Sequence, residues 1–284
     1  MNLILRAAMP DDYHCECRYC AKLYKGEILN EDGSYPNKFD RNKDYPDKGT
    51  ANNGKKVEGK LPGHLAKTPL HLARFCVGEF SKKNDWVYDP TMGSGTTGVE
   101  ALRAGRRAIG AELDPEHYKV ARRNMKGFAE GDAERWDLVN VDARKIVNLP
   151  KLSLVINNPP YIGDKSKAPG AGVYEYRKIE GQIGLMKEGP AYYDAIMDLY
   201  EPAVRALKTG GFLCIGVKDM MRRQEYYLLH YYLTRAVEQR FPDMKCVAVH
   251  LLRHWPMTGN MRSYEKRFGI WPALYQTITT LKKD

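Results

Sequence analysis

The chain has 284 residues, of which 43% are hydrophobic, and a formal net charge of +10 at pH 7. This length and composition can support one large domain, or one domain with an appendage. No apolar run reaches the roughly 18 residues of a membrane span, and the first residues lack the apolar core of a signal peptide. The sequence therefore predicts a cytoplasmic protein, and its basic charge favours a polyanionic partner.

The first sixty residues differ in composition from the rest. Residues 25–60 are rich in Asn, Asp, Gly, Lys and Pro and hold few aliphatic residues, which predicts an irregular arm over residues 1–60. Cys15, Cys17 and Cys20 lie close together near its start, at a spacing that could share one zinc ion. A complete zinc site needs four ligands, and no second cysteine pair follows nearby. Zinc binding and free thiols therefore both stay open.

Helices and strands are predicted to alternate over the rest of the chain. Short apolar runs between turn residues predict strands over residues 86–88, 108–111, 137–141, 152–157, 212–217, 246–251 and 274–281. Apolar residues at helical spacing and cap signals predict helices over residues 71–77, 96–104, 114–124, 196–207 and 224–239. Gly210 and Gly211 are expected to end the fourth helix. This alternation predicts an α/β fold with an open, mostly parallel sheet covered by helices on both faces.

One turn between a predicted strand and a predicted helix has the form of a ligand-binding loop. The first strand is followed by Asp89, a turn with Gly93 and Gly95, and the helix that starts at Thr96. Glycines in such a turn let backbone amides approach a ligand closely. A Gly-Ser-Gly turn alone says little, but the fourth strand leads into Asn157-Asn158-Pro159-Pro160-Tyr161. There a proline pair fixes the backbone at the sheet edge where open α/β sheets bind ligands.

Three acids, Asp89, Glu112 and Asp142, each end a predicted strand. Glu112 follows Asp89 by 23 residues, close to the spacing of about 20 at which an acid binds a ribose hydroxyl in nucleotide folds. The full Gly-x-Gly-x-x-Gly pattern and the Lys-Ser/Thr ending of a P-loop are absent, which argues against a phosphate-bearing dinucleotide. An acid at the first turn suits a cationic ligand, such as the amino and sulfonium groups of S-adenosylmethionine.

Two stretches resemble one enzyme family. Residues 89–124 are similar to the cofactor half of the amino-methyltransferases that modify exocyclic nitrogens of nucleic acid bases, and Asn158-Pro159-Pro160-Tyr161 is similar to their catalytic motif. The resemblance covers roughly residues 61–281 and includes Gln182-Ile183-Gly184. It implies a Rossmann-like class I methyltransferase fold over residues 61–284, with a mostly parallel seven-stranded sheet and a C-terminal antiparallel strand. Many relatives have the two motifs in the reverse order, so the place of target recognition stays open.

The resemblance also implies roles for individual residues. The methionine part of S-adenosylmethionine is expected to lie against Lys67, Thr68, Asp89, Thr91, Gly93, Ser94, Gly95 and Thr96. Glu112 would hold the ribose hydroxyls, and Asp142 the adenine amino group.

The chemistry of amino methylation explains the catalytic motif. An exocyclic amino nitrogen donates its lone pair into the base ring, so it is a poor nucleophile. The side-chain oxygen of Asn158 and the carbonyl of Pro159 can accept its two hydrogens and draw the lone pair back onto nitrogen. Pro160 completes the turn, and Tyr161 would stack on a base extruded from the duplex. The alternative is that these residues form only a proline turn.

The sequence therefore predicts a DNA methyltransferase that acts on adenine N6 or cytosine N4, with the asparagine slightly favouring adenine. Three alternatives stay open: methylation of an rRNA or tRNA base, methylation of protein glutamine, and an inactive nucleic-acid-binding subunit of the same fold. The candidate phosphate contacts are Lys165, Lys167, Arg222, Arg223, Arg253, Arg262 and Lys266.

Overall fold

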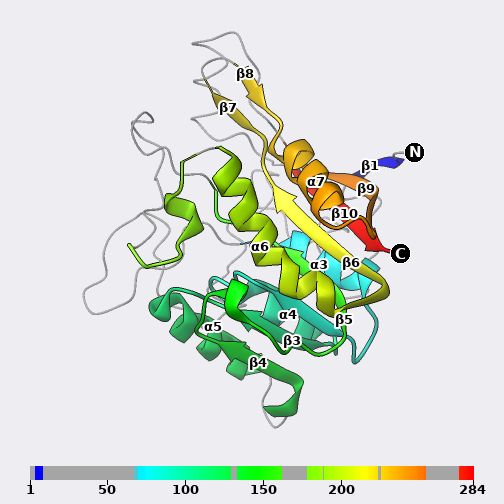
Figure 1. The fold of residues 1–284 in the computed structure, drawn as a ribbon. Helices are drawn as coiled ribbons and strands as arrows, with labels where there is room; N and C mark the ends of the chain where they lie inside the picture. The colour runs from blue at the N-terminus through cyan, green and yellow to red at the C-terminus, as the bar shows by residue number, and fades with distance from the viewer. Residues whose placement is uncertain are drawn as a thin grey trace, which may run out of the picture. The chain divides into compact units, whose positions relative to one another are not determined.

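The structure is a computed structural model that describes residues 4–8, 68, 70–128, 133–161, 178–187, 189–222, 225–253 and 275–284 (Figure 1). The chain divides into two compact units. The larger unit holds Asp40–Cys214 and Lys283–Asp284, and the smaller unit holds Met1–Phe39 and Ile215–Lys282. The domain boundary predicted between residues 60 and 61 falls outside the described residues, so that division stays a prediction.

Five described strands of the larger unit are neighbours in a sheet. They are β2 (Trp86–Asp89), β3 (Arg107–Ala111), β4 (Trp136–Val139), β5 (Leu152–Asn157) and β6 (Leu207–Val217), of which residues 215–217 belong to the smaller unit. Their order is β6-β5-β2-β3-β4, and β2 runs parallel to both β3 and β5. Every residue of β5 is buried, as expected for a strand of a parallel sheet covered on both faces. The carboxyl end of β2 therefore lies between the carboxyl ends of β3 and β5.

Four described helices belong to the same unit. They are α3 (Leu70–Phe80), α4 (Thr96–Arg103), α5 (Pro115–Phe128) and α6 (Pro190–Ala206). The side chain of Asp114 accepts a hydrogen bond from the backbone N–H of Glu116 at 2.9 Å, which caps the start of α5. A buried ion pair with 2.6 Å between Arg74 Nε and Glu100 Oε2 joins α3 to α4. No described helix has the length and apolar content needed to cross a lipid bilayer.

The predicted α/β class is confirmed, and each of the seven predicted strands is present. The end of α6 was predicted wrongly, because the helix ends at Ala206 and Gly210 and Gly211 lie inside β6. Gly210 has a φ of 77°. A Cβ at Gly211 would lie 2.8 Å from the carbonyl oxygen of Lys208 and 3.2 Å from that of Ser153. These glycines therefore allow the close approach of β6 to the backbone of β5.

The smaller unit contains three strands and one helix that continue the α/β pattern. They are β1 (Ile4–Ala8), β9 (Met244–Arg253), β10 (Tyr275–Lys283, whose last residue belongs to the larger unit) and α7 (Leu229–Arg240). The strand order is β1-β9-β10, and β1 runs parallel to β9. β1 lies inside the arm, residues 1–60, that the sequence predicted to be irregular.

A short antiparallel hairpin precedes α7. It consists of β7 (Met220–Arg222) and β8 (Glu225–Tyr227). This corrects the helix predicted over residues 224–239, because the first part of that range is a strand and α7 begins at Leu229. The carboxylate of Asp219 accepts a hydrogen bond from the backbone N–H of His230 at 3.2 Å. Asp219 precedes the hairpin in the chain. Its carboxylate caps α7 by accepting a backbone N–H of the first turn, which has no acceptor within the helix.

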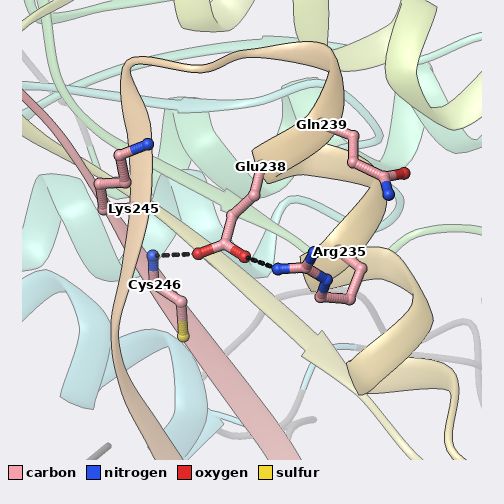
Figure 2. A pocket seen from close by; sticks show the side chains of 5 residues that line it. All are labelled: Arg235, Glu238, Gln239, Lys245 and Cys246. Carbon is pink, nitrogen blue, oxygen red and sulfur yellow. Dashed lines mark hydrogen bonds and ion pairs between the residues drawn. The ribbon is translucent and has the colours of Figure 1, made fainter. Parts of the chain in front are cut away.

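Glu238 links α7 to β9 within the smaller unit. Its Oε1 accepts a hydrogen bond from the backbone N–H of Cys246 at 3.1 Å, and its Oε2 accepts one from Arg235 Nη1 at 3.0 Å (Figure 2). These residues line a pocket of about 450 Å³ together with Gln239 and Lys245. Through its bond to Cys246, Glu238 ties the helix to the strand, and Arg235 of the same helix engages its second oxygen.

Candidate functional site

The turn between β2 and α4 is built on two glycines with positive φ. Gly93 has a φ of 59° and Gly95 a φ of 90°, values that residues with side chains rarely adopt. A Cβ at Gly95 would also lie 3.1 Å from the Cα of Ala121 in α5. Asn124 of α5 donates a hydrogen bond from Nδ2 to the carbonyl of Ser94 at 2.8 Å. The turn is therefore held closely against α5, in a shape that favours glycine.

Asp89, the last residue of β2, supports the turn from inside. Its side chain is almost fully buried, at 2% exposure. Oδ1 accepts a hydrogen bond from the backbone N–H of Thr91 at 3.0 Å, and Oδ2 accepts one from the hydroxyl of Thr97 at 2.7 Å. Burial raises the pKa of Asp89 to about 6, although these hydrogen bonds lower it. Asp89 thus organises the turn, and its expected contact with the methionine part of a cofactor stays a prediction.

Glu112 follows β3 and reaches the same turn. Its Oε2 accepts a hydrogen bond from the backbone N–H of Gly93 at 2.7 Å, and its Oε1 accepts one from that of Asp114 at 2.9 Å. Burial raises the pKa of Glu112 to about 7, against the effect of these hydrogen bonds and with a smaller contribution from the charges of Asp114 and Asp89. A carboxylate offers about four acceptor positions. The remaining positions of Glu112 can accept hydroxyl donors such as those of a ribose.

Asn157 connects this turn to β5 and α6, and the sequence did not identify it as a site residue. Its Nδ2 donates to the hydroxyl of Thr91 at 2.7 Å and to Asp89 Oδ1 at 3.4 Å. Its Oδ1 accepts a hydrogen bond from the hydroxyl of Tyr200 in α6 at 2.9 Å. The one signal in the sequence is an amide at the end of an otherwise apolar buried strand, since buried polar groups need partners.

Asn158 has a buried oxygen at the end of β5. Its Nδ2 donates to the hydroxyl of Thr68 at 3.0 Å. Its Oδ1 is buried and accepts no hydrogen bond from the described residues. This contact holds the amide nitrogen against Thr68, and the predicted role of Thr68 in lining the cofactor stays a prediction. The side chain of Asn158 therefore retains one acceptor for a donor from outside the described chain.

The proline turn after Asn158 is held by α6. The hydroxyl of Tyr192 donates a hydrogen bond to the carbonyl of Pro160 at 3.0 Å. Tyr192 is fully buried, whereas Tyr161 at the end of the motif is half-buried. The sequence did not identify Tyr192, which lies 32 residues from its partner. Helix α6 thus contacts both Pro160, through Tyr192, and Asn157, through Tyr200.

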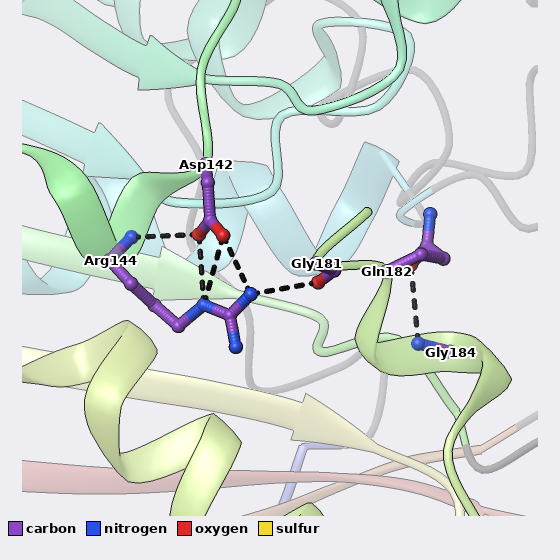
Figure 3. A network of polar contacts seen from close by, with 5 residues as sticks. All are labelled: Asp142, Arg144, Gly181, Gln182 and Gly184. Atoms are coloured by element: carbon purple, nitrogen blue, oxygen red, sulfur yellow. Dashed lines mark hydrogen bonds and ion pairs between the residues drawn. The ribbon is translucent and has the colours of Figure 1, made fainter. Parts of the chain in front are cut away.

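Asp142, three residues after the end of β4, is paired with Arg144 (Figure 3). Asp142 Oδ2 lies 2.6 Å from Arg144 Nη2, and Oδ1 lies 2.9 Å from Nε. The same Nη2 donates to the carbonyl of Gly181 at 3.0 Å. Partial burial would raise the pKa of Asp142, but the hydrogen bonds and charge of Arg144 outweigh it and lower the pKa. Arg144 therefore competes for the acceptor that was predicted to bind an adenine amino group.

The segment that begins at Gly181 includes the predicted Gln182-Ile183-Gly184 stretch. The side chain of Gln182 accepts a hydrogen bond from the backbone N–H of Gly184 at 3.2 Å and caps the short helix η4 (Ile183–Leu185; Figure 3). Gly181 has a φ of 84°, and a Cβ there would lie 2.7 Å from Asp142 Oδ2. This stretch is thus anchored to Asp142 and Arg144.

The structure brings most of the described site residues to one edge of the sheet. β2 lies between β3 and β5, so the glycine turn after β2 lies between Glu112 and Asn158. Ser94 and Thr96 are buried within the turn and the first turn of α4. Parallel strands place ligand sites at such carboxyl ends.

Several predicted residues lie outside this description. The residues beyond the described ranges are Lys67, Lys165, Lys167, Arg223, Arg262 and Lys266, together with Cys15, Cys17 and Cys20. Arg222 lies in β7, and Arg253 is the last residue of β9. Within the described ranges, no group of three or more His, Cys, Asp or Glu side chains is arranged to hold a metal ion.

Residues 18–123 match a protein family described as DNA methylase. This range includes the glycine turn and Glu112, and it ends before the Asn-Pro-Pro-Tyr motif.

The chain is also similar to two type II methyltransferases. It is 40% identical over 76 residues to M2.DpnII from Streptococcus pneumoniae, which is 27% of this chain and 28% of that protein. It is 35% identical over 109 residues to M2.LlaDCHI from Lactococcus lactis subsp. cremoris, which is 38% of each. The chain thus spans less than two fifths of the length of these relatives. Among solved structures, TrmN from Thermus thermophilus aligns with a TM-score of 0.47 and 19% identity over 75% of this chain and 47% of that chain.

Proposed function

We propose that this chain is a DNA amino-methyltransferase, the family to which its residues 18–123 belong. The reaction transfers a methyl group from S-adenosylmethionine to an exocyclic amino nitrogen, adenine N6 or cytosine N4. The observation that carries the proposal is the buried Oδ1 of Asn158, which has no partner among the described residues. A buried acceptor without a donor costs about 1–3 kcal/mol, and an amino group of a base would supply that donor.

Asn158 activates the amino group by accepting one of its hydrogens. This contact opposes delocalisation of the nitrogen lone pair into the ring, and it strengthens as the nitrogen becomes positive. The amide nitrogen of Asn158 is engaged by Thr68, and its oxygen is the end without a partner among the described residues. The carbonyl of Pro159 accepts the second hydrogen, in a turn that Tyr192 fixes through Pro160. Tyr161 stacks on the extruded base, and the surplus proton leaves after the transfer.

The glycine turn and Glu112 would hold the cofactor. Their geometry fits it, because Glu112 keeps acceptor positions for ribose hydroxyls, and Gly93 and Gly95 carry no side chain at the turn. When bound, S-adenosylmethionine supplies an electrophilic methyl group on a positively charged sulfur. Asp89 keeps the turn in shape. Arg144 makes four hydrogen bonds to the carboxylate of Asp142, so binding of the adenine amino group there would require Arg144 to give up at least one of them.

DNA is the substrate that the comparisons favour. The matched family is described as DNA methylase, and both relatives are named type II methyltransferases. The net charge of +10 fits a polyanionic substrate. We place the reaction in the cytoplasm, as the sequence predicts.

The test is methyl transfer from labelled S-adenosylmethionine to duplex DNA, with RNA as a parallel substrate, followed by identification of the methylated nucleoside. The expected product is N6-methyladenine or N4-methylcytosine from DNA. Asn158→Ala should lower the single-turnover rate by at least about a hundredfold while cofactor binding stays near the parent value. Asn148→Ala, at an exposed position, is the matched control and should keep the parent rate. Methylation of RNA alone, or of neither nucleic acid, would refute the proposal.

A further inference from the structure

Two buried side chains hold Thr91 in the glycine turn. The backbone N–H of Thr91 donates to Asp89 Oδ1 at 3.0 Å, and its hydroxyl oxygen accepts a hydrogen bond from Asn157 Nδ2 at 2.7 Å. Asp89 and Asn157 are almost fully buried, whereas Thr91 itself is half-buried. The core therefore positions one hydroxyl group that is still partly accessible.

The groups around Asn157 determine the direction of its hydrogen bond with Thr91. Nδ2 also lies 3.4 Å from Asp89 Oδ1, and the oxygen of the amide accepts from the hydroxyl of Tyr200 at 2.9 Å. An ionised carboxylate only accepts, so the amino end of the amide faces Asp89 and Thr91. The hydroxyl of Thr91 is then the acceptor, and its own proton is donated to none of the described residues. Thr91 therefore keeps one donor for a ligand.

Thr91 is tied to the side of the turn on which β5 lies. β2 has β3 on one side and β5 on the other. Glu112, the candidate partner of the ribose, follows β3, whereas Thr91 is bonded to Asn157, the last residue of β5. Asn158, the candidate partner of the target amino group, comes next in the chain. Because the methyl group must reach that amino group, the methionine end of the cofactor belongs on the side of Thr91.

The methionine end of S-adenosylmethionine has one group that accepts hydrogen bonds well. Its ammonium group only donates, its sulfonium sulfur is positively charged, and its carboxylate accepts. The surroundings of this carboxylate are acidic, because Asp89 and Glu112 both contact the glycine turn. Like charges repel, so an anionic group at this place needs a donor close by. The proton of the Thr91 hydroxyl is a donor of the required kind.

We propose that the hydroxyl of Thr91 donates a hydrogen bond to the carboxylate of the methionine part of S-adenosylmethionine, and that Asn157 is the positioning residue that sets the direction of this donation. The proposal rests on the proposed function, which brings the cofactor to the glycine turn. It names the group of the cofactor that Thr91 recognises and gives Asn157 a role in binding it.

The test compares two ligands by titration calorimetry with the full chain: S-adenosylhomocysteine, and the analogue in which hydrogen replaces its carboxylate. Thr91→Val keeps the shape of the side chain and removes the hydroxyl, so it should weaken binding of S-adenosylhomocysteine about ten- to a hundredfold. Its affinity for the analogue should stay near the parent value. Thr91→Ser keeps a hydroxyl and should restore most of the affinity. Thr209→Val, at an exposed position in β6, is the matched control and should bind both ligands like the parent.

Two further variants complete the test. Thr91→Ala leaves room for a water molecule at Asn157 Nδ2, and it repeats the comparison if circular dichroism shows that Thr91→Val does not fold. Asn157→Ala keeps Thr91 but removes the group that holds its hydroxyl oxygen. This variant should lose part of the parent's preference for the ligand with a carboxylate. An unchanged preference would mean that Asn157 serves stability alone.

The remaining outcomes overturn the proposal. An equal loss of affinity for both ligands, or a loss for neither, means that the Thr91 hydroxyl does not bind the carboxylate. Slower methyl transfer with unchanged binding of both ligands places the hydroxyl against the target base instead. In each of these cases the parent chain still binds S-adenosylhomocysteine and methylates DNA, so the proposed function stands. If the parent binds neither ligand and does not methylate DNA, both fail.

Discussion

Burial makes the charge of Glu112 a sensitive property of the site. A carboxylate surrounded by protein loses the hydration that stabilises its ionised form, so its pKa rises from 4.5 to about 7 although two backbone N–H groups donate to it. The ionised form is also the stronger acceptor for hydroxyl groups. A residue with this pKa is partly protonated near neutral pH, so small pH changes alter its capacity to bind a ligand.

Replacing Glu112 by glutamine should remove part of the pH dependence of folding stability. Because the folded pKa lies above the unfolded value of 4.5, the contribution of this group is fully present below about pH 4.5 and is lost as the pH rises through about 7. In urea unfolding, the parent should therefore lose more free energy of unfolding than Glu112→Gln between about pH 5 and about pH 8. Glu134→Gln, at an exposed position, should follow the parent. Identical pH dependence in parent and Glu112→Gln would contradict the raised pKa.

The motif residues could be predicted from the sequence, whereas the residues that position them could not. Asn158 and the glycine turn stand in recognisable patterns. Tyr200 lies 43 residues from Asn157, and Thr68 lies 90 residues from Asn158. Such pairs depend on how the chain folds, and no local spacing indicates them. The ion pair of Asp142 was missed for a related reason, because it depends on the short turn after β4.

At the level of elements, α6 is the support of the catalytic turn. Its residues Tyr192 and Tyr200 are both fully buried and lie eight positions apart, so they face the same side of the helix. One donates to Pro160 and the other to Asn157, on either side of Asn158. The helix therefore holds the backbone carbonyl of Pro160 and the side chain of Asn157, on the two sides of the candidate catalytic amide.

Tyr192 is expected to act as a positioning residue, so Tyr192→Phe should lower kcat while leaving KM for DNA and cofactor affinity nearly unchanged. The variant leaves the carbonyl of Pro160 without its donor, which should also cost about 1–3 kcal/mol of stability. A displaced turn should slow methyl transfer by about tenfold or more, since a small misplacement of the reacting groups lowers the reaction rate strongly. Steady-state kinetics and calorimetric cofactor binding measure the two effects. Tyr193→Phe removes a neighbouring hydroxyl from the same helix as the control. A parental kcat in Tyr192→Phe would show that the contact serves stability alone.

The predicted elements were correct where the sequence pattern is local. Apolar runs identified the strands, and Pro115 after a capping acid identified the start of α5. The start of α7 was missed because its cap comes from Asp219, on the far side of a hairpin. Glycine likewise has two uses that sequence alone does not separate, ending a helix or allowing close strand packing. Gly211 serves the second.

For the whole molecule, residues 18–123 match a family described as DNA methylase, which agrees with the prediction from the glycine turn and Glu112, whereas the Asn-Pro-Pro-Tyr motif lies beyond the matched range. The α/β class follows from alternating strands and helices, which is a property of the entire pattern. The place of DNA recognition did not follow from it, because the fold positions the site without specifying which surface contacts the substrate.

The net charge of +10 should make DNA binding strongly dependent on salt. Each phosphate neutralised by lysine or arginine releases condensed counterions, so log affinity should fall linearly with log salt concentration. Binding of a short duplex, followed by fluorescence anisotropy between about 50 and about 200 mM salt, should weaken by at least about tenfold. An uncharged probe of similar size gives the baseline. An affinity for DNA that does not change over this range would rule out an interface built on phosphate contacts.

The amide of Asn157 imposes a chemical polarity on the end of β5. One side of the group must donate, toward Thr91 and Asp89, and the other must accept, from Tyr200. Aspartate would place an acceptor beside the carboxylate of Asp89, leucine would satisfy neither side, and glutamine is one methylene too long for a fully packed position. Asparagine is the only natural side chain of this length with both groups. Replacing Asn157 by another residue should therefore leave at least one of these hydrogen bonds unmade, whatever substrate the protein acts on.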